Sequence, residues 1–245
     1  MATAVARPGT RASGLPGRRF DHLFFSAMAG LLLLTVFIGF AHSYYLAGIF
    51  HAPLPSLITH LHGALFSCWI ALFVTQTLLV AAGRVDIHRI LGIAGFLLAC
   101  LMVIVGVLVA TDFLARSPVP DTKMFYIIPL TDILIFGTLV AFAFRARSNP
   151  SAHKRLILVA TITLMGAALF RWPFPFVHHN LRLVAILNYL FLLMLVIYDL
   201  WSTRKIHRAT LRASAFLIFV EEIRLPIGHT AAWHSFAAWV QSLAK

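Results

Sequence analysis

Residues 90–113 read ILGIAGFLLACLMVIVGVLVATDF and contain no charged residue before Asp112. An apolar α-helix of about 20 residues is long enough to cross the hydrocarbon core of a bilayer. Five further runs of similar character lie before and after this one, at 22–46, 57–82, 125–146, 155–172 and 180–202. The sequence therefore predicts an all-α fold, a polytopic transmembrane helix bundle.

The composition excludes an ordinary soluble domain. Of the 245 residues, 60% are hydrophobic and 11% are charged, whereas soluble domains have roughly 45–50% and about 25%. The net charge is +12, but the basic residues cluster between apolar runs. We therefore expect a lipid bilayer, and no nucleic acid, as the partner. Cys68 and Cys100 lie inside apolar runs and are expected to be small packing residues.

The chain divides into three segments. Residues 1–19 are basic and rich in Pro and Gly, and we expect a disordered cytoplasmic tail. Residues 20–202 form the six-helix transmembrane bundle. Residues 203–245 contain a weak seventh span at 209–228, followed at 231–243 by an amphipathic helix of the interfacial kind. The weak span carries four charged residues, Arg212, Glu221, Glu222 and Arg224, and so cannot face lipid on all sides. The sequence therefore does not decide between six and seven spans.

The distribution of Lys and Arg predicts the orientation. Four basic residues lie on one side of the predicted bundle: Arg116, Lys123, Arg171 and Arg182. The other side holds 14: Arg7, Arg11, Arg18, Arg19, Arg84, Arg89, Arg145, Arg147, Lys154, Arg155, Arg204, Lys205, Arg208 and Arg212. Such a bias in short loops marks the cytoplasmic side. We expect a multi-pass protein of the cell (inner) membrane with a cytoplasmic N-terminus.

Three turns on the basic side share one pattern, in which a histidine and a basic residue open the next helix. These histidines are His88, His153 and His207. The pattern predicts related helical hairpins, whose interfaces often carry sites in membrane bundles. The alternative is that the basic residues serve topology alone.

The motifs around these turns carry a resemblance. Three groups of residues carry it: His60-Leu61-His62-Gly63 with Trp69, Gln76 and Gly83-Arg84; His88-Arg89-Ile90-Leu91-Gly92; and His153-Lys154-Arg155-Leu156 with Arg171-Trp172-Pro173. Through these motifs the chain resembles a family of uncharacterised bacterial multi-pass membrane proteins over about residues 22–202. The His-led helix starts are more distantly similar to membrane proteins of haem and cytochrome oxidase assembly. The first resemblance implies the architecture and no reaction, and the second implies haem or metal.

Polar side chains in and beside the spans fall into two layers and are the candidates for a site, because ionisable residues inside a bilayer are costly. The outer layer contains His42, His60, His62, Asp112, Asp132, Arg171, His178, His179 and Asn188. The inner layer contains Asp21, His22, Arg84, His88, Arg89, His153, Lys154, Arg155, Asp199 and His207.

Helical geometry separates two of the outer histidines. On a regular helix His60 and His62 point about 160° apart. His62 shares its face with Trp69 and Gln76, which predicts a cavity wall, although packing is the alternative reading of both. His60 lies on the opposite side, near a ladder of small residues that admits a close neighbour.

Asp132 lies about two turns into an apolar run and must be paired, protonated or metal-bound. Its expected partners at similar depth are Arg171, His62 and Asn188. A structural ion pair with Arg171 and a metal or proton-relay role both remain open.

Imidazole with carboxylate suits a transition metal, so the candidate metal ligands are His62, Asp132 and His178. Haem b requires two facing imidazoles. The outer layer offers His62 with His178 or His179, and the inner layer offers His88 with His153. Side chains that could line or pair with such a site are His60, Trp69, Gln76, Asp112, Arg171 and Asn188.

Three functions follow from these candidates. The first is metal or haem handling, in electron transfer or as an assembly factor, at a His- and Asp-lined site near the outer face. The second is a small-molecule or proton-coupled transporter, and the third is a structural membrane subunit with a membrane-protein partner or a second copy. No Walker loop, dinucleotide-binding glycine motif or nucleophile–base pair stands out, so enzymatic activity stays undecided.

The orientation makes a direct prediction. In a background with Cys68→Ser and Cys100→Ser, the variants Ser56→Cys and Ser151→Cys should react with an impermeant thiol reagent from opposite sides of the membrane. Labelling of both positions from the same side would refute the topology.

Overall fold

The computed structural model describes residues 16–53, 55–117, 121–177 and 180–244, and within these ranges it contains helices and no strand. The elements are α1 Pro16–Phe40, a π-helical turn η1 Ala41–Tyr45, α2 Ala47–Phe50, α3 Leu57–Ala81, α4 Val85–Arg116, α5 Thr122–Phe125, α6 Ile127–Arg145, α7 Pro150–Thr163, α8 Met165–Leu169, α9 Leu181–Thr203, α10 Arg208–Gly228 and α11 Ala231–Leu243.

The predicted fold class is confirmed. Six helical stretches in the described part of the chain are long and apolar enough to cross a membrane: Phe20–Tyr45, Leu57–Ala81, Val85–Arg116, Thr122–Arg145, Pro150–Leu169 and Leu181–Thr203. The weak segment at 209–228 is helical as α10 but is not among the six, because its charges lower its hydropathy.

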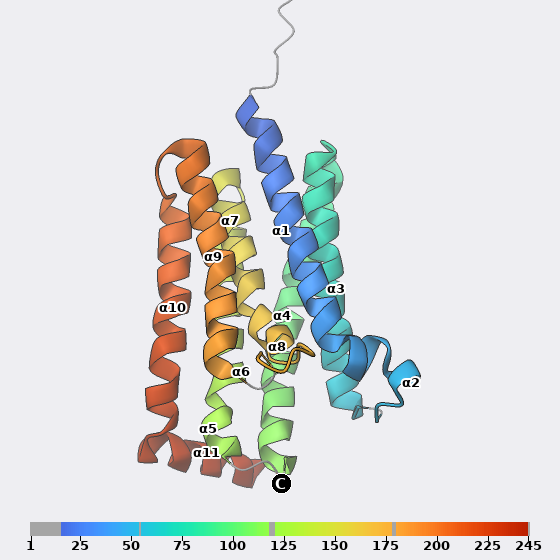
Figure 1. The fold of residues 1–245 in the computed structure, drawn as a ribbon, viewed down its shortest axis with the longest axis vertical. Helices are drawn as coiled ribbons and strands as arrows, with labels where there is room; N and C mark the ends of the chain where they lie inside the picture. The colour runs from blue at the N-terminus through green and yellow to red at the C-terminus, as the bar shows by residue number, and fades with distance from the viewer. Residues whose placement is uncertain (1–15, 54, 118–120, 178–179, 245) are drawn as a thin grey trace, which may run out of the picture.

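The long helices run side by side, and α10 runs alongside them (Figure 1). The turns that follow α3, α6 and α9 carry Arg84, Arg147 and Arg204 and lie at one end of the bundle, which we call the basic end (top of Figure 1). The short helix α11 lies across the opposite end, below α4 and α5, and contacts both.

Local sequence explains where the helices begin and turn. Side-chain oxygens of Ser56, Asn149 and Thr230 accept backbone hydrogen bonds at the starts of α3, α7 and α11. Pro150 occupies the first turn of α7, where its missing N–H costs nothing. The tight α3–α4 turn contains Gly83 with a φ of 75°, a conformation that favours glycine.

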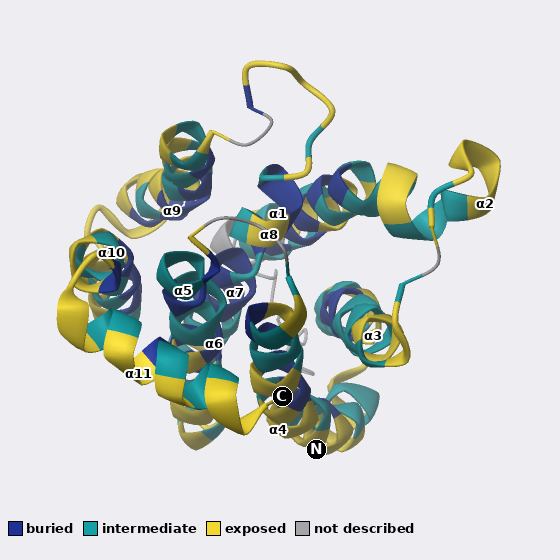
Figure 2. Ribbon diagram, turned by 90° about the horizontal axis from the view of Figure 1, so that it is seen from below, coloured by how far each residue is buried: buried dark blue, intermediate teal, exposed yellow. Residues whose placement is uncertain are grey.

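The core lies between the helices, and the outward surface is also apolar. Phe136 and Leu195 are fully buried, whereas Ile90 and Phe219 are 74% and 61% exposed. Figure 2 shows the buried faces turned inward and the exposed faces turned outward around the ring of helices. An exposed surface this apolar is expected where lipid, and not water, surrounds the bundle.

One close helix contact depends on a glycine. Gly39 near the end of α1 lies directly against the backbone of Ala168 in α8, and a Cβ atom at this position would collide with that backbone. Gly30, also in α1, has no such neighbour within 4 Å. The absence of a side chain at position 39 therefore permits α1 and α8 to pack.

We predict that Gly39→Ala lowers the free energy of unfolding in detergent by about 1–3 kcal/mol, because the backbones must separate. Gly30→Ala is the matched control on the same helix and should be neutral or slightly stabilising. Equal effects of the two variants on the free energy of unfolding would show that the close α1–α8 contact does not determine stability.

Candidate functional site

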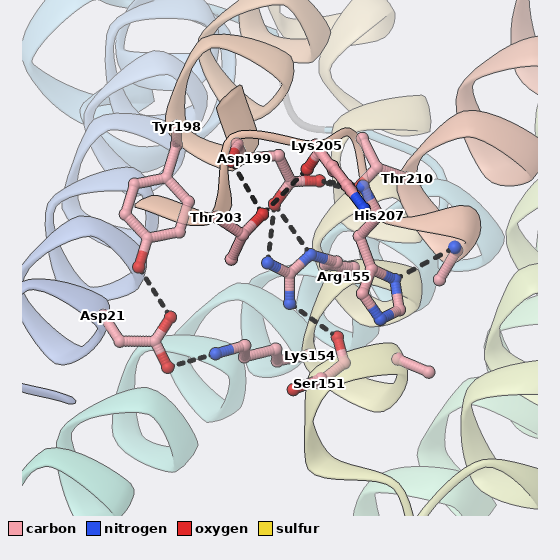
Figure 3. A network of polar contacts seen from close by, with 12 residues as sticks. Asp21, Ser151, Lys154, Arg155, Tyr198, Asp199, Thr203, Lys205, His207 and Thr210 are labelled. Atoms are coloured by element: carbon pink, nitrogen blue, oxygen red, sulfur yellow. Dashed lines mark hydrogen bonds and ion pairs between the residues drawn. The ribbon is translucent and has the colours of Figure 1, made fainter. Parts of the chain in front are cut away.

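A buried ion pair lies at the basic end (Figure 3). Arg155 of α7 donates from Nε and Nη2 to Oδ1 of Asp199 in α9, at 2.9 and 2.5 Å, and the two side chains are 4% and 0% exposed. The other carboxylate oxygen of Asp199 accepts from the Thr210 hydroxyl at 2.6 Å and from the backbone N–H of His207 at 3.0 Å. The pair thus joins α7, α9 and the start of α10.

A second ion pair extends this group toward α1. Lys154 of α7 contacts the carboxylate of Asp21, whose other oxygen accepts a hydrogen bond of 2.7 Å from the hydroxyl of Tyr198 in α9. We call the set Asp21, Lys154, Arg155, Tyr198, Asp199, His207 and Thr210 the basic-end network. It ties four helices together.

His207 serves this network as a cap. Its Nδ1 accepts a hydrogen bond of 3.0 Å from the backbone N–H of Ala209. Burial, reinforced by the nearby charge of Arg155, lowers the pKa of His207. A neutral ring is required for this role, because a doubly protonated imidazole cannot accept.

A second polar group lies between α6, α9 and α10. Arg224 donates from Nη1 to Oδ1 of Asp132 at 2.5 Å, and its Nη2 lies 3.8 Å from Oε1 of Glu221. Asn188 of α9 donates to the same Glu221 oxygen at 3.4 Å, and the Tyr189 hydroxyl donates to the neighbouring Glu222 at 2.8 Å. We call Asp132, Glu221, Arg224 and Asn188 the carboxylate cluster.

The charges of the carboxylate cluster do not balance. The buried carboxylate of Glu221 and the partly buried carboxylate of Asp132 face one guanidinium. The second oxygen of Glu221 and the amide oxygen of Asn188 are buried without a hydrogen-bond partner. Buried polar atoms are normally partnered, and an unpaired charge in a low-dielectric site is costly. The cluster is therefore suited to bind a proton or a small cation.

The expected ion pair of Asp132 with Arg171 is wrong. The structure pairs Asp132 with Arg224 and not with Arg171. Arg171 donates to the backbone oxygen of Ala167 at 2.8 Å and lies 5.0 Å from the centre of the Phe40 ring. Arg224 was not among the expected partners of Asp132 because it belongs to the weak seventh segment. The sequence did indicate that this segment has a buried polar face, because its charged residues keep it from facing lipid on all sides.

The predicted outer metal site is not assembled by the described residues. Among them, no group of three or more His, Cys, Asp and Glu side chains is placed to hold a metal ion. His62 packs on the Phe66 ring with centres 4.0 Å apart, and its Nδ1 is buried without a partner. Asp132 is held by Arg224 instead. His178 and His179 lie outside the described residues.

The remaining outer candidates have separate neighbours. His60 lies against Tyr44, and Asp112 pairs with Arg116 one turn away at 2.7 Å. Trp69 is buried and donates to the Thr161 hydroxyl at 3.3 Å, as a packing residue does.

The two inner candidates for haem, in contrast, lie together. The rings of His88 and His153 have centres 6.2 Å apart, and the Gln76 amide donates to the backbone oxygen of His88 at 3.2 Å. Gln76 of α3 thus contacts the backbone of His88 in α4, and the His88 ring lies beside that of His153 in α7.

Comparison of the chain with protein-family models, with curated proteins and with solved structures found no match. The family resemblance stays an expectation.

The basic-end network predicts a large stability effect. Asp199→Asn leaves the guanidinium of Arg155 buried and unpaired, so the free energy of unfolding in detergent should fall by about 3–5 kcal/mol. The double variant Arg155→Met with Asp199→Leu removes both charges and should recover most of this loss.

The matched control is Asp86→Asn, which breaks the solvent-exposed pair of Asp86 with Arg84. It should leave the unfolding curve unchanged, because exposed pairs contribute little. A loss as large as that of Asp199→Asn would contradict the structural role of the buried pair.

Proposed function

We propose that this multi-pass membrane protein is a proton-coupled transporter in which Glu221 binds the transported proton. The observation that carries the proposal is the excess carboxylate: Asp132 and Glu221 share the single guanidinium of Arg224. With Asp132 paired to Arg224, a proton on Glu221 makes the cluster neutral. Ionisable groups at membrane depth are frequent members of proton relays in transporters.

The depth of Glu221 supports this role. It is preceded in α10 by 13 residues, counted from Arg208, which corresponds to about 20 Å of helix from the basic end. It is 7% exposed and faces α6 and α9. Burial of this carboxyl group inside the bundle is what a proton-binding site within a bilayer needs.

Arg224 supplies an element that can respond to the proton. Its two terminal nitrogens reach toward different carboxylates, 2.5 Å from Asp132 and 3.8 Å from Glu221. Loss of the proton from Glu221 would draw the guanidinium toward it and away from Asp132. Pro226 lies inside α10 two residues later and removes a helical hydrogen bond, which permits this segment to bend.

The orientation completes the proposal. The excess of basic residues on one side favours the cell (inner) membrane with a cytoplasmic N-terminus. The carboxylate cluster then lies in the outer half of the bilayer, nearer to the non-cytoplasmic side.

Metal or haem handling is the second candidate, and one observation favours it. His88 and His153 approach to 6.2 Å between ring centres at the basic end. The outer site proposed from His62, His178 and His179 has no comparable pair among the described residues. A structural subunit, the third function, would need both polar groups to be fully satisfied, which the carboxylate cluster is not.

The transport proposal is tested in proteoliposomes that contain a trapped pH-sensitive dye, with a potassium–valinomycin potential to drive proton entry. The wild type should acidify the lumen faster than empty liposomes do. Glu221→Gln should reduce this rate to the background of empty liposomes, because the neutral amide cannot exchange a proton.

Glu222→Gln is the matched control, because Glu222 is adjacent in sequence but exposed and bonded to Tyr189. It should retain the wild-type rate. Size-exclusion profiles establish that both variants remain folded. The proposal fails if Glu221→Gln transports protons as the wild type does, or if both variants lose the flux equally.

A further inference from the structure

The basic end contains a polar group that neither the basic-end network nor the carboxylate cluster uses. Gln76 lies near the end of α3, and His88 and His153 lie in the first turns of α4 and α7. The two imidazole planes are inclined by 85°, with centres 6.2 Å apart. We call these three residues the Gln–His–His group.

The tautomer of His153 follows from its hydrogen bond. Its Nδ1 lies 2.9 Å from the backbone oxygen of Ala143 in α6. A carbonyl oxygen only accepts, so Nδ1 carries the proton, which leaves Nε2 as the nitrogen that can bind a metal. Metal-ligating histidines show this same arrangement, in which the other ring nitrogen donates to a carbonyl.

The other two side chains leave buried polar atoms unused. Nδ1 of His88 and Oε1 of Gln76 are both buried without a hydrogen-bond partner. The amide of Gln76 is held in place because its Nε2 donates to the His88 carbonyl at 3.2 Å. Unpartnered buried atoms in one small group indicate a missing partner.

We propose that the Gln–His–His group binds one late transition-metal ion, copper or zinc, through imidazole nitrogen with the amide oxygen as an additional ligand. Metal–imidazole bonds of about 2.0 Å place two imidazole centres roughly 5–6 Å apart, close to the 6.2 Å observed. Nitrogen ligands suit copper and zinc, whereas magnesium and calcium prefer oxygen.

The surrounding packing favours an ion over haem. Phe96 of α4 stacks on Phe144 of α6 with ring centres 4.2 Å apart, and Phe144 is adjacent to the Ala143 that holds His153. These aromatic rings pack α4 against α6 next to the residue that holds His153. A metal ion fits between the imidazoles without opening this contact, whereas a tetrapyrrole would have to separate the helices.

The site also explains a difference among the His-led helix starts. Those of α4 and α7 meet each other, at the interface of two hairpins, where sites often lie in membrane bundles. The third, His207, is occupied in capping α10. The proposal does not depend on proton transport, because the two sites share no residue.

The test uses full-length protein purified in detergent with an affinity tag that contains no histidine. The protein is stripped with a chelator, incubated with Zn²⁺ or with Cu⁺ under reducing conditions, desalted and analysed for bound metal by mass spectrometry. The wild type should retain one ion per chain. His88→Ala and His153→Ala should each weaken binding by roughly tenfold or more, and Gln76→Leu should weaken it less.

His229→Ala is the control, because His229 is exposed at the opposite end of the bundle. It should bind metal as the wild type does. A second readout is thermal unfolding: metal should raise the Tm of the wild type and of His229→Ala, and should not raise that of His88→Ala. This comparison within each variant separates lost binding from lost folding.

Two outcomes would overturn the proposal. One is a wild type that retains neither ion, or histidine variants that retain as much as the wild type. The other is a Soret band that appears on titration with haem and disappears in both histidine variants, which would assign the pair to haem and not to a metal ion.

Discussion

Arg155 and Asp199 form an ion pair sealed from solvent, and the positions of three helices depend on it. Neither charge is tolerable alone in an apolar bundle, so α7 and α9 are held in register at the basic end. The second oxygen of Asp199 binds Thr210 and so fixes where α10 begins. From that start α10 runs along the bundle and brings Glu221 to the level of Asp132. A contact at one end thereby determines the composition of a cluster about 20 Å away.

The two polar groups differ in how completely their charges are matched. In the basic-end network, Arg155 is paired with Asp199, whose second oxygen accepts two further hydrogen bonds. Such a group has one stable arrangement and holds the helices in place. In the carboxylate cluster, one guanidinium serves Asp132 and Glu221, and an oxygen of Glu221 stays without a partner. An unmatched group has two protonation states with different contacts, which is the property a proton-coupled transporter requires.

The fold class could be predicted from the hydropathy of the sequence, because six runs long enough to span a bilayer leave few alternatives to a helical bundle. Counting from helix starts also placed Asp132 at its depth and grouped His88 with His153. Counting does not tell which helices are neighbours, so Arg171 was expected where Arg224 is found. The charges of α10 lowered its hydropathy and made it look peripheral. Two of these charged residues, Glu221 and Arg224, instead find partners in α6 and α9.

We propose that Glu221 holds a proton in the resting protein. Infrared spectroscopy of the purified protein at neutral pH measures this directly, because a protonated carboxyl group absorbs separately from a carboxylate. The account predicts a buried protonated carboxyl band in the wild type, which is retained in Glu222→Gln and absent in Glu221→Gln. A wild-type spectrum without this band, or a band that persists in Glu221→Gln, would contradict it.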